Sequence, residues 1–315
     1  MDSTYTIVVP DADVLARVCG TNDSNLRLIE EHLGVPVFTR GNELSVEKDD
    51  PAVQQKFRFI IDRIIDEIGD GSDGSEDMIA SILHAGTHAA FETSSITVPG
   101  GIRKVYPRSV GQADYVQAMR KHDMVFCTGP AGSGKTFLAV AEALRLLMSH
   151  KKSSIILTRP IVEAGESLGF LPGDLEQKIN PYLRPLFDAM TSVLPRETVR
   201  RLTESGVIET APLAYMRGRT LSDSVIILDE AQNASCAQMK MFLTRMGENS
   251  KMFVTGDITQ TDLPARTRSG LVNAIEILSG IPDIAKIEMS CEDVVRNPLV
   301  QKIVQAYEND KKDER

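Results

Sequence analysis

A glycine-rich stretch in the first half of the chain carries the residue types that bind phosphate groups. Shortly after the apolar run 124–127 come Gly129, Pro130, Ala131, Gly132, Ser133, Gly134, Lys135 and Thr136. They match the spacing G-x-x-x-x-G-K-[ST], a P-loop, whose backbone N–H groups surround phosphate oxygens at the start of a helix. Lys135 is expected to act at the β- and γ-phosphates, and the Thr136 hydroxyl is expected to bind Mg²⁺. A chance glycine-rich turn is the alternative, which the strand-like run before the loop disfavours.

Two adjacent carboxylates, Asp229 and Glu230, follow a second apolar run at 224–228. Because successive side chains of a strand point in different directions, neighbouring acids at its end can serve different purposes. We expect Asp229 to hold Mg²⁺ through a bound water and Glu230 to orient and deprotonate the attacking water. A P-loop alone is compatible with an ATPase, a GTPase or a kinase. The acidic pair favours hydrolysis of the nucleotide over transfer of its phosphoryl group to a small acceptor. Solvated acids at the start of a loop are the alternative.

A third apolar run, 251–255, leads into the polar turn Gly256 to Gln260. Gln260 is predicted to contact the γ-phosphate or the attacking water and so to sense whether the phosphate is present. By itself the turn is equally compatible with an ordinary loop. Its position in series with the other two motifs favours the sensor interpretation.

The motifs lie among predicted strands that alternate with helical segments. The strands are 124–127, 154–158, 207–210, 224–228, 251–255 and 284–289. Most are continuous apolar runs, which are typical of strands buried on both faces of a parallel sheet. We therefore predict a doubly wound α/β domain whose ligands bind at the carboxyl ends of the strands.

Composition and charge are those of an ordinary globular protein. No apolar stretch has transmembrane length and the N-terminus lacks the features of a signal peptide, so we expect no membrane association and a cytoplasmic location. The four cysteines are far apart, which argues against a disulfide framework or a zinc site. Of the net charge of −9, residues 1–100 contribute −11, from 7 basic and 18 acidic residues, and the remainder contributes +2. The acidic total argues against indiscriminate polyanion binding but allows a local basic groove in the second part.

Residues 1–68 are predicted to form a small α/β domain. The stretch 69–77 ends it, because its glycines and like charges are poorly suited to a hydrophobic core; residues 69–97 are assigned as linker and helix, and 98–315 as a second domain. The loop that starts at Gly20 joins two predicted helices, and the domain resembles a KH domain, which clamps RNA backbone with a G-x-x-G loop. Asp23 stands at the fourth loop position, and its charge favours a structural or docking role over RNA binding.

The motifs in their order resemble those of the PhoH-like ATPases. The matching stretches are GPAGSGKTFLAVA, RPIVEAGESLGFLPGDLEQKINPYLRPLFDAM, LAYMRGRTLSDSVIILDEAQNAS, QMKMFLTRMG, GDITQTDLP and DVVRNPLVQKIVQAY. These are cytosolic bacterial proteins whose core is similar to the first RecA-like domain of superfamily 1 helicases, and the longer members have a similar KH-like N-terminus. The resemblance covers about residues 98–307. It implies a RecA-like P-loop NTPase fold, ATP with Mg²⁺ as ligands, and the roles argued above for Lys135, Thr136, Asp229, Glu230 and Gln260.

Two further site residues come from this resemblance. Gln112 stands just upstream of the first core strand, at the position where helicases of this type have a glutamine that recognises the adenine base. Arg296, in the stretch DVVRNP, is the arginine expected to stabilise γ-phosphate charge in the transition state, from the same chain or from a neighbouring subunit. An ordinary salt bridge at a helix start is the alternative for Arg296.

The stretch 159–190 contains too many glycines and prolines for a simple crossover, and its apolar residues argue for order. We interpret it as part of an RNA or partner surface, with the predicted phosphate contacts Arg159, Lys178, Arg184, Arg217 and Arg219. A packed insertion with solvated charges is the alternative.

The sequence therefore predicts an ATP-hydrolysing P-loop protein that remodels or unwinds RNA. Because one RecA-like lobe is expected per chain, we expect a homo-oligomer, a hexameric ring, to complete the nucleotide site. The resemblance implies an rRNA-processing endoribonuclease as a partner. A nucleotide-switched scaffold with slow turnover and a small-molecule P-loop kinase are the alternatives.

Overall fold

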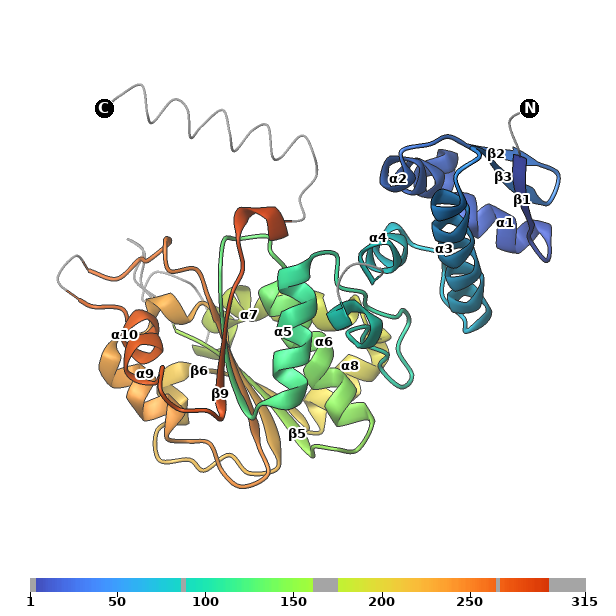
Figure 1. The fold of residues 1–315 in the computed structure, drawn as a ribbon. Coiled ribbons are helices and arrows are strands. Elements are labelled where there is room, and N and C mark those ends of the chain that lie inside the picture. Colours follow the sequence, from blue (N-terminus) through green and yellow to red (C-terminus); the bar gives the residue numbers. More distant parts are fainter. Residues whose placement is uncertain (1–3, 86–88, 161–174, 265–266, 295–315) are drawn as a thin grey trace, which may run out of the picture.

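Figure 1 shows the computed structural model of the 315-residue chain, which describes residues 4–85, 89–160, 175–264 and 267–294. A small N-terminal unit, drawn in blue, lies beside a larger unit that is built around a parallel sheet. The predicted chemistry belongs to the larger unit.

The large sheet consists of six parallel strands. They are β4 (Met124–Thr128), β5 (Ser154–Arg159), β6 (Ile208–Pro212), β7 (Ser224–Leu228), β8 (Lys251–Gly256) and β9 (Ile284–Glu288). Their hydrogen-bonded order is β6-β5-β7-β8-β4-β9. The strands predicted from the sequence are confirmed to within about two residues, and so is the doubly wound α/β class.

Helices cover both faces of the sheet (Figure 1). One layer comprises α5 (Val110–Lys121), α6 (Lys135–Met148), α7 (Leu175–Thr191) and α8 (Arg196–Glu204), and the other comprises α9 (Cys236–Leu243) and α10 (Gly270–Ile277). Successive strand residues belong to alternate cores, so that Val125 packs with the first layer and Phe126 with the second. Both faces are buried, which explains why the strands are continuous apolar runs.

The strand register brings the three sequence motifs to one edge of the sheet. Cys127 of β4 pairs with Thr255 of β8, and Leu228 of β7 pairs with Val254 of β8. Because the strands are parallel, the P-loop after β4, the acids after β7 and the turn after β8 all lie at their carboxyl ends.

The small unit contains a three-stranded antiparallel sheet with helices. Its elements are β1 (Thr4–Val8), α1 (Ala12–Cys19), α2 (Ser24–Leu33), β2 (Val37–Arg40), β3 (Glu43–Glu47) and α3 (Pro51–Gly69), and its strand order is β1-β3-β2. In the loop between α1 and α2, Asn22 and Asp23 have left-handed φ angles of 54° and 59°, and both are exposed. The small unit contains both helices and strands, as predicted, and two helices flank the loop that starts at Gly20. The relation to KH domains stays a prediction.

The stretch after α3 is packed, although its sequence is polar. Ser72 is 6% exposed, and Asn25 donates a hydrogen bond from Nδ2 to the Gly74 carbonyl (2.8 Å). The next helix, α4 (Glu76–Ala85), adds Met78 and Ile79 to the core of the small unit. Backbone and amide hydrogen bonds, rather than apolar side chains, hold the residues around Ser72 in place.

A polar cluster joins α3 to the segment that leads into α5. The Glu67 carboxylate accepts hydrogen bonds from Lys104 Nζ (2.6 Å) and Tyr106 Oη (2.9 Å), and Arg108 pairs with Asp77 (2.7 Å). Burial alone would raise the pKa of Glu67, but the hydrogen bonds from Lys104 and Tyr106 outweigh burial and lower it. The two units are therefore connected by buried contacts as well as by the chain.

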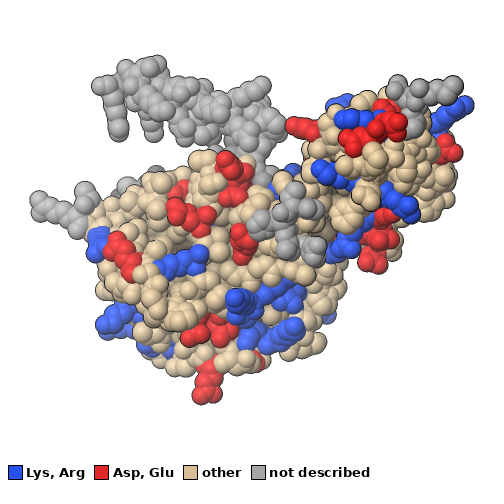
Figure 2. Space-filling model, in the orientation of Figure 1, with Lys and Arg blue, Asp and Glu red and all other residues tan. Residues whose placement is uncertain are grey.

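Figure 2 shows basic and acidic side chains interspersed on this face of both units, without a continuous stripe of one sign. An RNA surface on this face could not rest on charge alone and would need specific side chains.

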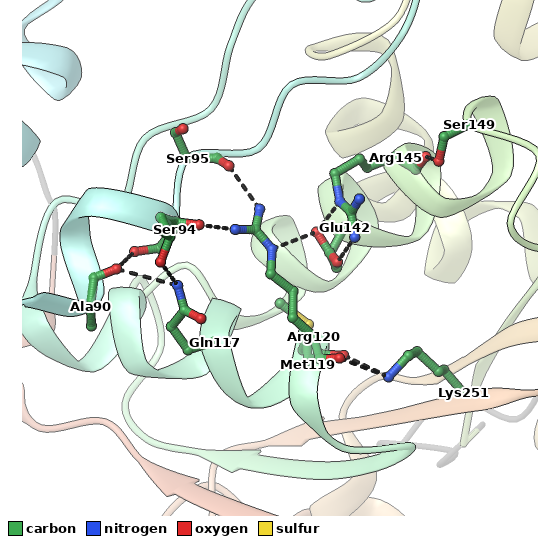
Figure 3. Close-up of polar contacts among 11 residues, drawn as sticks. Ala90, Ser94, Ser95, Gln117, Met119, Arg120, Glu142, Arg145, Ser149 and Lys251 are labelled. Carbon is green, nitrogen blue, oxygen red and sulfur yellow. Dashed lines mark hydrogen bonds and ion pairs between the residues drawn. The ribbon is translucent and has the colours of Figure 1, made fainter.

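A buried carboxylate, that of Glu142 in α6, ties together three segments of the larger unit (Figure 3). Its side chain is fully buried and accepts hydrogen bonds from Nε (2.8 Å) and Nη2 (2.5 Å) of Arg145. Arg120 of α5 lies 3.8 Å from the same carboxylate and donates a hydrogen bond to the Ser95 carbonyl (2.7 Å). The cluster connects the P-loop helix to α5 and to the residues that follow the short helix η2 (Ala89–Thr93).

Glu142→Gln is expected to destabilise the larger unit by about 3 kcal/mol, because two partly buried guanidinium groups lose their carboxylate. In a unit of this size the melting temperature should fall by about 6–12 °C. The control is Glu197→Gln on α8: this side chain is 76% exposed and pairs with Arg200, so a change below about 0.5 kcal/mol is expected. Thermal unfolding measures both variants, and equal melting temperatures would show that the buried cluster adds no net stability.

Candidate active site

The loop 129–134 and the start of α6 form a cradle of backbone N–H groups. Gly134 is the N-cap of α6, and no side chain in the described part of the chain caps this helix, so its first N–H groups are available to an anion. Gly129 has a φ of 149°, and a Cβ there would lie 2.6 Å from the Met289 carbonyl oxygen. The loop therefore requires glycine at this position to bring its backbone so close to the end of β9.

Lys135 lies over the loop that precedes it. Its Nζ donates hydrogen bonds to the carbonyls of Gly129 and Pro130, both at 2.8 Å, and lies 3.2 Å from Ser133 Oγ. The side chain is largely buried, and burial lowers the pKa of the Lys135 amine, an effect that the nearby carboxylate of Asp257 opposes. The amine is thus held beside the phosphate cradle by backbone oxygens.

Asp229 connects the end of β7 to the P-loop helix and to β8. Its Oδ1 accepts hydrogen bonds from Oγ1 of Thr136 (2.7 Å) and of Thr255 (2.8 Å). Its backbone N–H donates to the Thr158 carbonyl of β5 (3.0 Å), so the sheet fixes its position. A hydroxyl in contact with a carboxylate supplies oxygen ligands of the kind that Mg²⁺ prefers.

Glu230 has a left-handed backbone, with a φ of 53°, which is uncommon for a residue other than glycine. Its Oε1 accepts a hydrogen bond from Arg159 Nη2 (2.9 Å), and its Oε2 accepts one from Gln232 Nε2 (2.6 Å). The Oε1 of Gln232 in turn accepts the backbone N–H of Asp257 (3.1 Å). Gln232 therefore joins the predicted general base to the turn after β8.

The structure places Arg159 between the two acids rather than on an outer surface. Its Nη2 also lies 3.1 Å from Asp229 Oδ2, and only 16% of the side chain is exposed. The prediction that Arg159 contacts RNA phosphates is at odds with this position, because its guanidinium is engaged by active-site carboxylates. Sequence reasoning missed this contact and Gln232. The available signal was that Arg159 follows a predicted strand, at the edge where ligands bind.

A cavity of about 270 Å³ brings most of the predicted site residues together. Its lining consists of Ala131, Gly132, Gly134, Lys135, Thr136, Phe137, Asp229, Glu230, Gly256, Asp257 and Gln260. Lys135, Thr136, Asp229, Glu230 and Gln260 were all predicted site residues. Gln260 is exposed at the cavity, and its N–H donates to the Asp257 carbonyl (3.1 Å).

Asp257 is a further acid in the cavity wall. Its Oδ1 accepts hydrogen bonds from the N–H (2.9 Å) and the hydroxyl (2.6 Å) of Thr259. Its Oδ2 is buried and has no hydrogen-bond partner among the residues that the structure describes. Such an oxygen, together with the Thr136 and Asp229 oxygens and the N–H cradle, fits a magnesium-bound nucleotide.

Gln112 lies against the outside of the P-loop. Its Oε1 accepts the Arg108 N–H (2.7 Å), its Nε2 donates to the Ser133 carbonyl (3.1 Å), and its side chain is 5% exposed. It does not line the cavity that the described residues form. These contacts support the loop directly, and the adenine contact remains a prediction.

Arg296 lies outside the described residues, so its predicted role stays a prediction. Three residues earlier, Asp293 is buried, and its Oδ1 accepts the Gly111 N–H of α5 (3.2 Å) while its Oδ2 accepts the Ser290 N–H (2.7 Å). The described part of this motif is thus anchored to the start of α5.

The other arginines of the predicted RNA surface differ in their surroundings. Arg184 and Arg217 are exposed, whereas Arg219 forms a two-pronged ion pair with Glu209 (2.5 and 2.7 Å). The side chain of Lys178 lies outside the described part of the structure.

The described residues were predicted to hold neither a zinc site nor a membrane span. No three His, Cys, Asp or Glu side chains in the described ranges gather as a protein-only metal site requires. None of the described helices combines the length and the apolar character that crossing a bilayer requires.

The sheet, the P-loop and the strand-end acids together define a P-loop nucleotide-binding protein. A family model described as PhoH-like protein matches residues 104–308. The chain is 50% identical over 295 residues to a PhoH-like protein of Bacillus subtilis, covering 92% of each chain. It is 43% identical over 312 residues to a PhoH-like protein of Synechocystis, covering 97% of this chain and 95% of the relative. The chain therefore belongs to the PhoH family, as its motifs had suggested.

Two further similarities cover less of the molecule. Protein PhoH of Escherichia coli is 44% identical over 205 residues, which are 64% of this chain and 58% of that protein. The large terminase of a thermophilic bacteriophage matches 59% of this chain and 45% of its own, with a TM-score of 0.39 and 10% identity. The strand order and the site, not this last match, identify the fold.

Proposed function

We propose that the protein hydrolyses ATP in a Mg²⁺-dependent reaction and couples turnover to the binding and remodelling of RNA. The observation that carries hydrolysis is the pair of acids after β7. Asp229 contacts the Thr136 hydroxyl of the P-loop helix, and Glu230 lines the same cavity. A carboxylate beside the phosphate cradle is placed to take a proton from water.

In the proposed reaction each residue has a separate task. The N–H groups of the loop and Lys135 hold the β- and γ-phosphates, and Thr136 and Asp229 hold Mg²⁺, which supplies charge neutralisation. Glu230 accepts a proton from water as the water oxygen bonds to the γ-phosphorus. The bond to the β–γ bridging oxygen then breaks, and its electron pair leaves with ADP. Gln260 contacts the γ-phosphate or the water.

The proposed RNA contact follows β6, at the same edge of the sheet. Tyr215 is 53% exposed and Arg217 is exposed, so one offers a ring for base stacking and the other a cation for phosphate. Pro212, the last residue of β6, pairs with Arg159 in the sheet register. Bound RNA would therefore lie one strand away from a residue that touches both active-site acids.

A homo-oligomer, a hexameric ring, would supply the second surface that grips the nucleotide, and Arg296 would act in this chain or across such an interface. The N-terminal unit, with Asp23 exposed in its loop, suits docking of a partner such as an rRNA-processing endoribonuclease better than RNA binding. Light scattering tests the assembly, and a monomer with full ATPase activity would overturn it.

Single-stranded RNA is expected to stimulate phosphate release from ATP and Mg²⁺. Tyr215→Ala should weaken RNA binding by about 1–3 kcal/mol, or about 5- to 150-fold, whereas Tyr215→Phe keeps the stacking surface and the affinity. Arg217→Ala should reduce the salt dependence of binding by about one unit of slope. Filter binding at several salt concentrations measures both effects.

The matched control is Arg200→Ala, because Arg200 is an exposed arginine on α8, at 63%, outside this edge of the sheet. Its RNA affinity should equal that of the wild type. Turnover that is indifferent to RNA would favour the nucleotide-switched scaffold, and ATP consumption that needs a small acceptor would favour a kinase.

A further inference from the structure

Arg159 is held at the active-site acids by the sheet itself. Thr158 of β5 pairs with Leu228 of β7, so the next residues, Arg159 and Asp229, leave adjacent strand ends together. One nitrogen, Nη2, lies 2.9 Å from Glu230 Oε1 and 3.1 Å from Asp229 Oδ2. With 16% of its side chain exposed, the guanidinium is a largely buried positive charge between two carboxylates.

This arrangement bears on the task of Glu230 as a base. One Glu230 oxygen accepts from Gln232 and the other from Arg159, so an attacking water shares the carboxylate with two donors that already neutralise part of its charge. Gln232 is 2% exposed and is tied at its other end to the Asp257 N–H. Arg159 has the longer side chain, and because its Nη2 also lies 3.1 Å from Asp229 Oδ2, it can leave Glu230 and still keep a carboxylate partner.

A guanidinium that gives up one of two carboxylates in a largely buried place gains from a new anion, because a buried charge is stabilised by each opposite charge that it contacts. The γ-phosphate is the anion that the site would bring. Lys135, Glu230 and Gln260 line one cavity of about 270 Å³, so a phosphate held by Lys135 lies within it next to Glu230. The planar fork of an arginine also suits phosphate oxygens.

We propose that Arg159 is a catalytic residue acting in cis: when the triphosphate binds, its guanidinium moves from Glu230 Oε1 to the γ-phosphate. The move frees Glu230 for the attacking water and places a positive charge where negative charge develops. The atoms balance as in the hydrolysis above, since Arg159 only exchanges hydrogen bonds and gives up no proton. This inference rests on the proposed ATP hydrolysis and assigns the in-chain arginine to a described residue.

The test compares a diphosphate with a triphosphate. Affinities for ADP and for the non-hydrolysable β,γ-imido analogue of ATP, both with Mg²⁺, are measured by calorimetry for wild type, Arg159→Ala and Arg159→Lys. Arg159→Ala should weaken binding of the analogue about tenfold, which corresponds to the loss of one charge-assisted hydrogen bond. The affinity for ADP should change by no more than about twofold. Arg159→Lys keeps the charge and should recover part of the preference for the triphosphate.

Steady-state phosphate release is the second measurement. Arg159→Ala should lower kcat on the order of 10²–10³-fold, as for the loss of one donor to a developing oxyanion. The matched control is Arg200→Ala, because Arg200 also bridges two carboxylates, Glu197 (2.7 Å) and Glu204 (3.8 Å), but on the exposed surface of α8. This control should keep the wild-type affinities and kcat.

The alternatives give different results. If Arg159→Ala weakened the binding of ADP and of the analogue equally, Arg159 would only maintain the shape of the site. If the variant had a raised kcat, Arg159 would restrain Glu230. Either result overturns the proposal. If the wild type bound the analogue but released no phosphate from ATP, the proposed hydrolysis would be wrong. The effect of Arg159→Ala on the affinity for the analogue, relative to ADP, would still show whether Arg159 contacts the γ-phosphate.

Discussion

Glu230→Gln is expected to lower kcat for ATP hydrolysis by about 10²–10⁴-fold while nucleotide binding is kept. The glutamine oxygen can still accept a hydrogen bond from Arg159, but a neutral amide cannot take the proton of the attacking water. The side chain keeps its shape, and the only contact it must lose is the one from Gln232 Nε2, because the amide NH2 cannot accept that hydrogen bond. Phosphate release at saturating ATP measures kcat, and calorimetry with ADP measures binding.

The control for this variant is Glu209→Gln. Glu209 also pairs with an arginine, Arg219 (2.5 Å), but it lies on the edge strand β6 and does not line the cavity that the described residues form. Its turnover should match that of the wild type. If Glu230→Gln retained full turnover, Glu230 could not be the base. Asp257, whose Oδ2 has no partner in the described structure, would then be the acid to test.

Lys135→Ala is expected to weaken ATP and ADP binding by about 10- to 150-fold, because it removes a charge-assisted hydrogen bond worth about 1.5–3 kcal/mol. The amine donates to the carbonyls of Gly129 and Pro130, so the loop also loses a contact that holds it next to the phosphates. Both nucleotides should be affected, in contrast to Arg159→Ala. Calorimetry with each nucleotide and Mg²⁺ separates the two patterns.

A lysine with similar contacts provides the control. Lys152 donates hydrogen bonds to the carbonyl and, at 2.7 Å, to Oδ1 of Asn249, away from the cavity. Lys152→Ala should leave both affinities unchanged. Unchanged affinities in Lys135→Ala would show that the backbone cradle alone binds the phosphates, and that the role assigned to the amine is wrong.

Most strands of the larger unit could be predicted because they are short apolar runs that must be buried on both faces. The end of β7 follows from the first charged residue after such a run, Asp229. The packing of the polar stretch around Ser72 could not be predicted. It depends on contacts with distant partners, such as the bond between Asn25 and Gly74, and not on local apolar character.

The P-loop and the acidic pair were also accessible from the sequence, since each depends on residues that are close together in the chain. The surroundings of Gln112 were not. Its amide lies against the Ser133 carbonyl because α5 packs beside the P-loop helix, and the sequence motif carries no information on that contact. Likewise, the sequence marks Glu142 as one charged residue of an apolar helix, and only the packing of α5 explains its burial.

By itself, the sequence determined the fold class, the P-loop and the identity of the acids, because these depend on spacing within one strand, turn or helix. The tertiary structure decided which of these groups meet. Arg159 and Glu230 are 71 residues apart in the chain, and they touch because β5 and β7 are neighbours in the sheet. Strand order depends on how the helices pack on both faces of the sheet, so no local pattern specifies it. The partner of the proposed general base therefore became visible only in the folded chain.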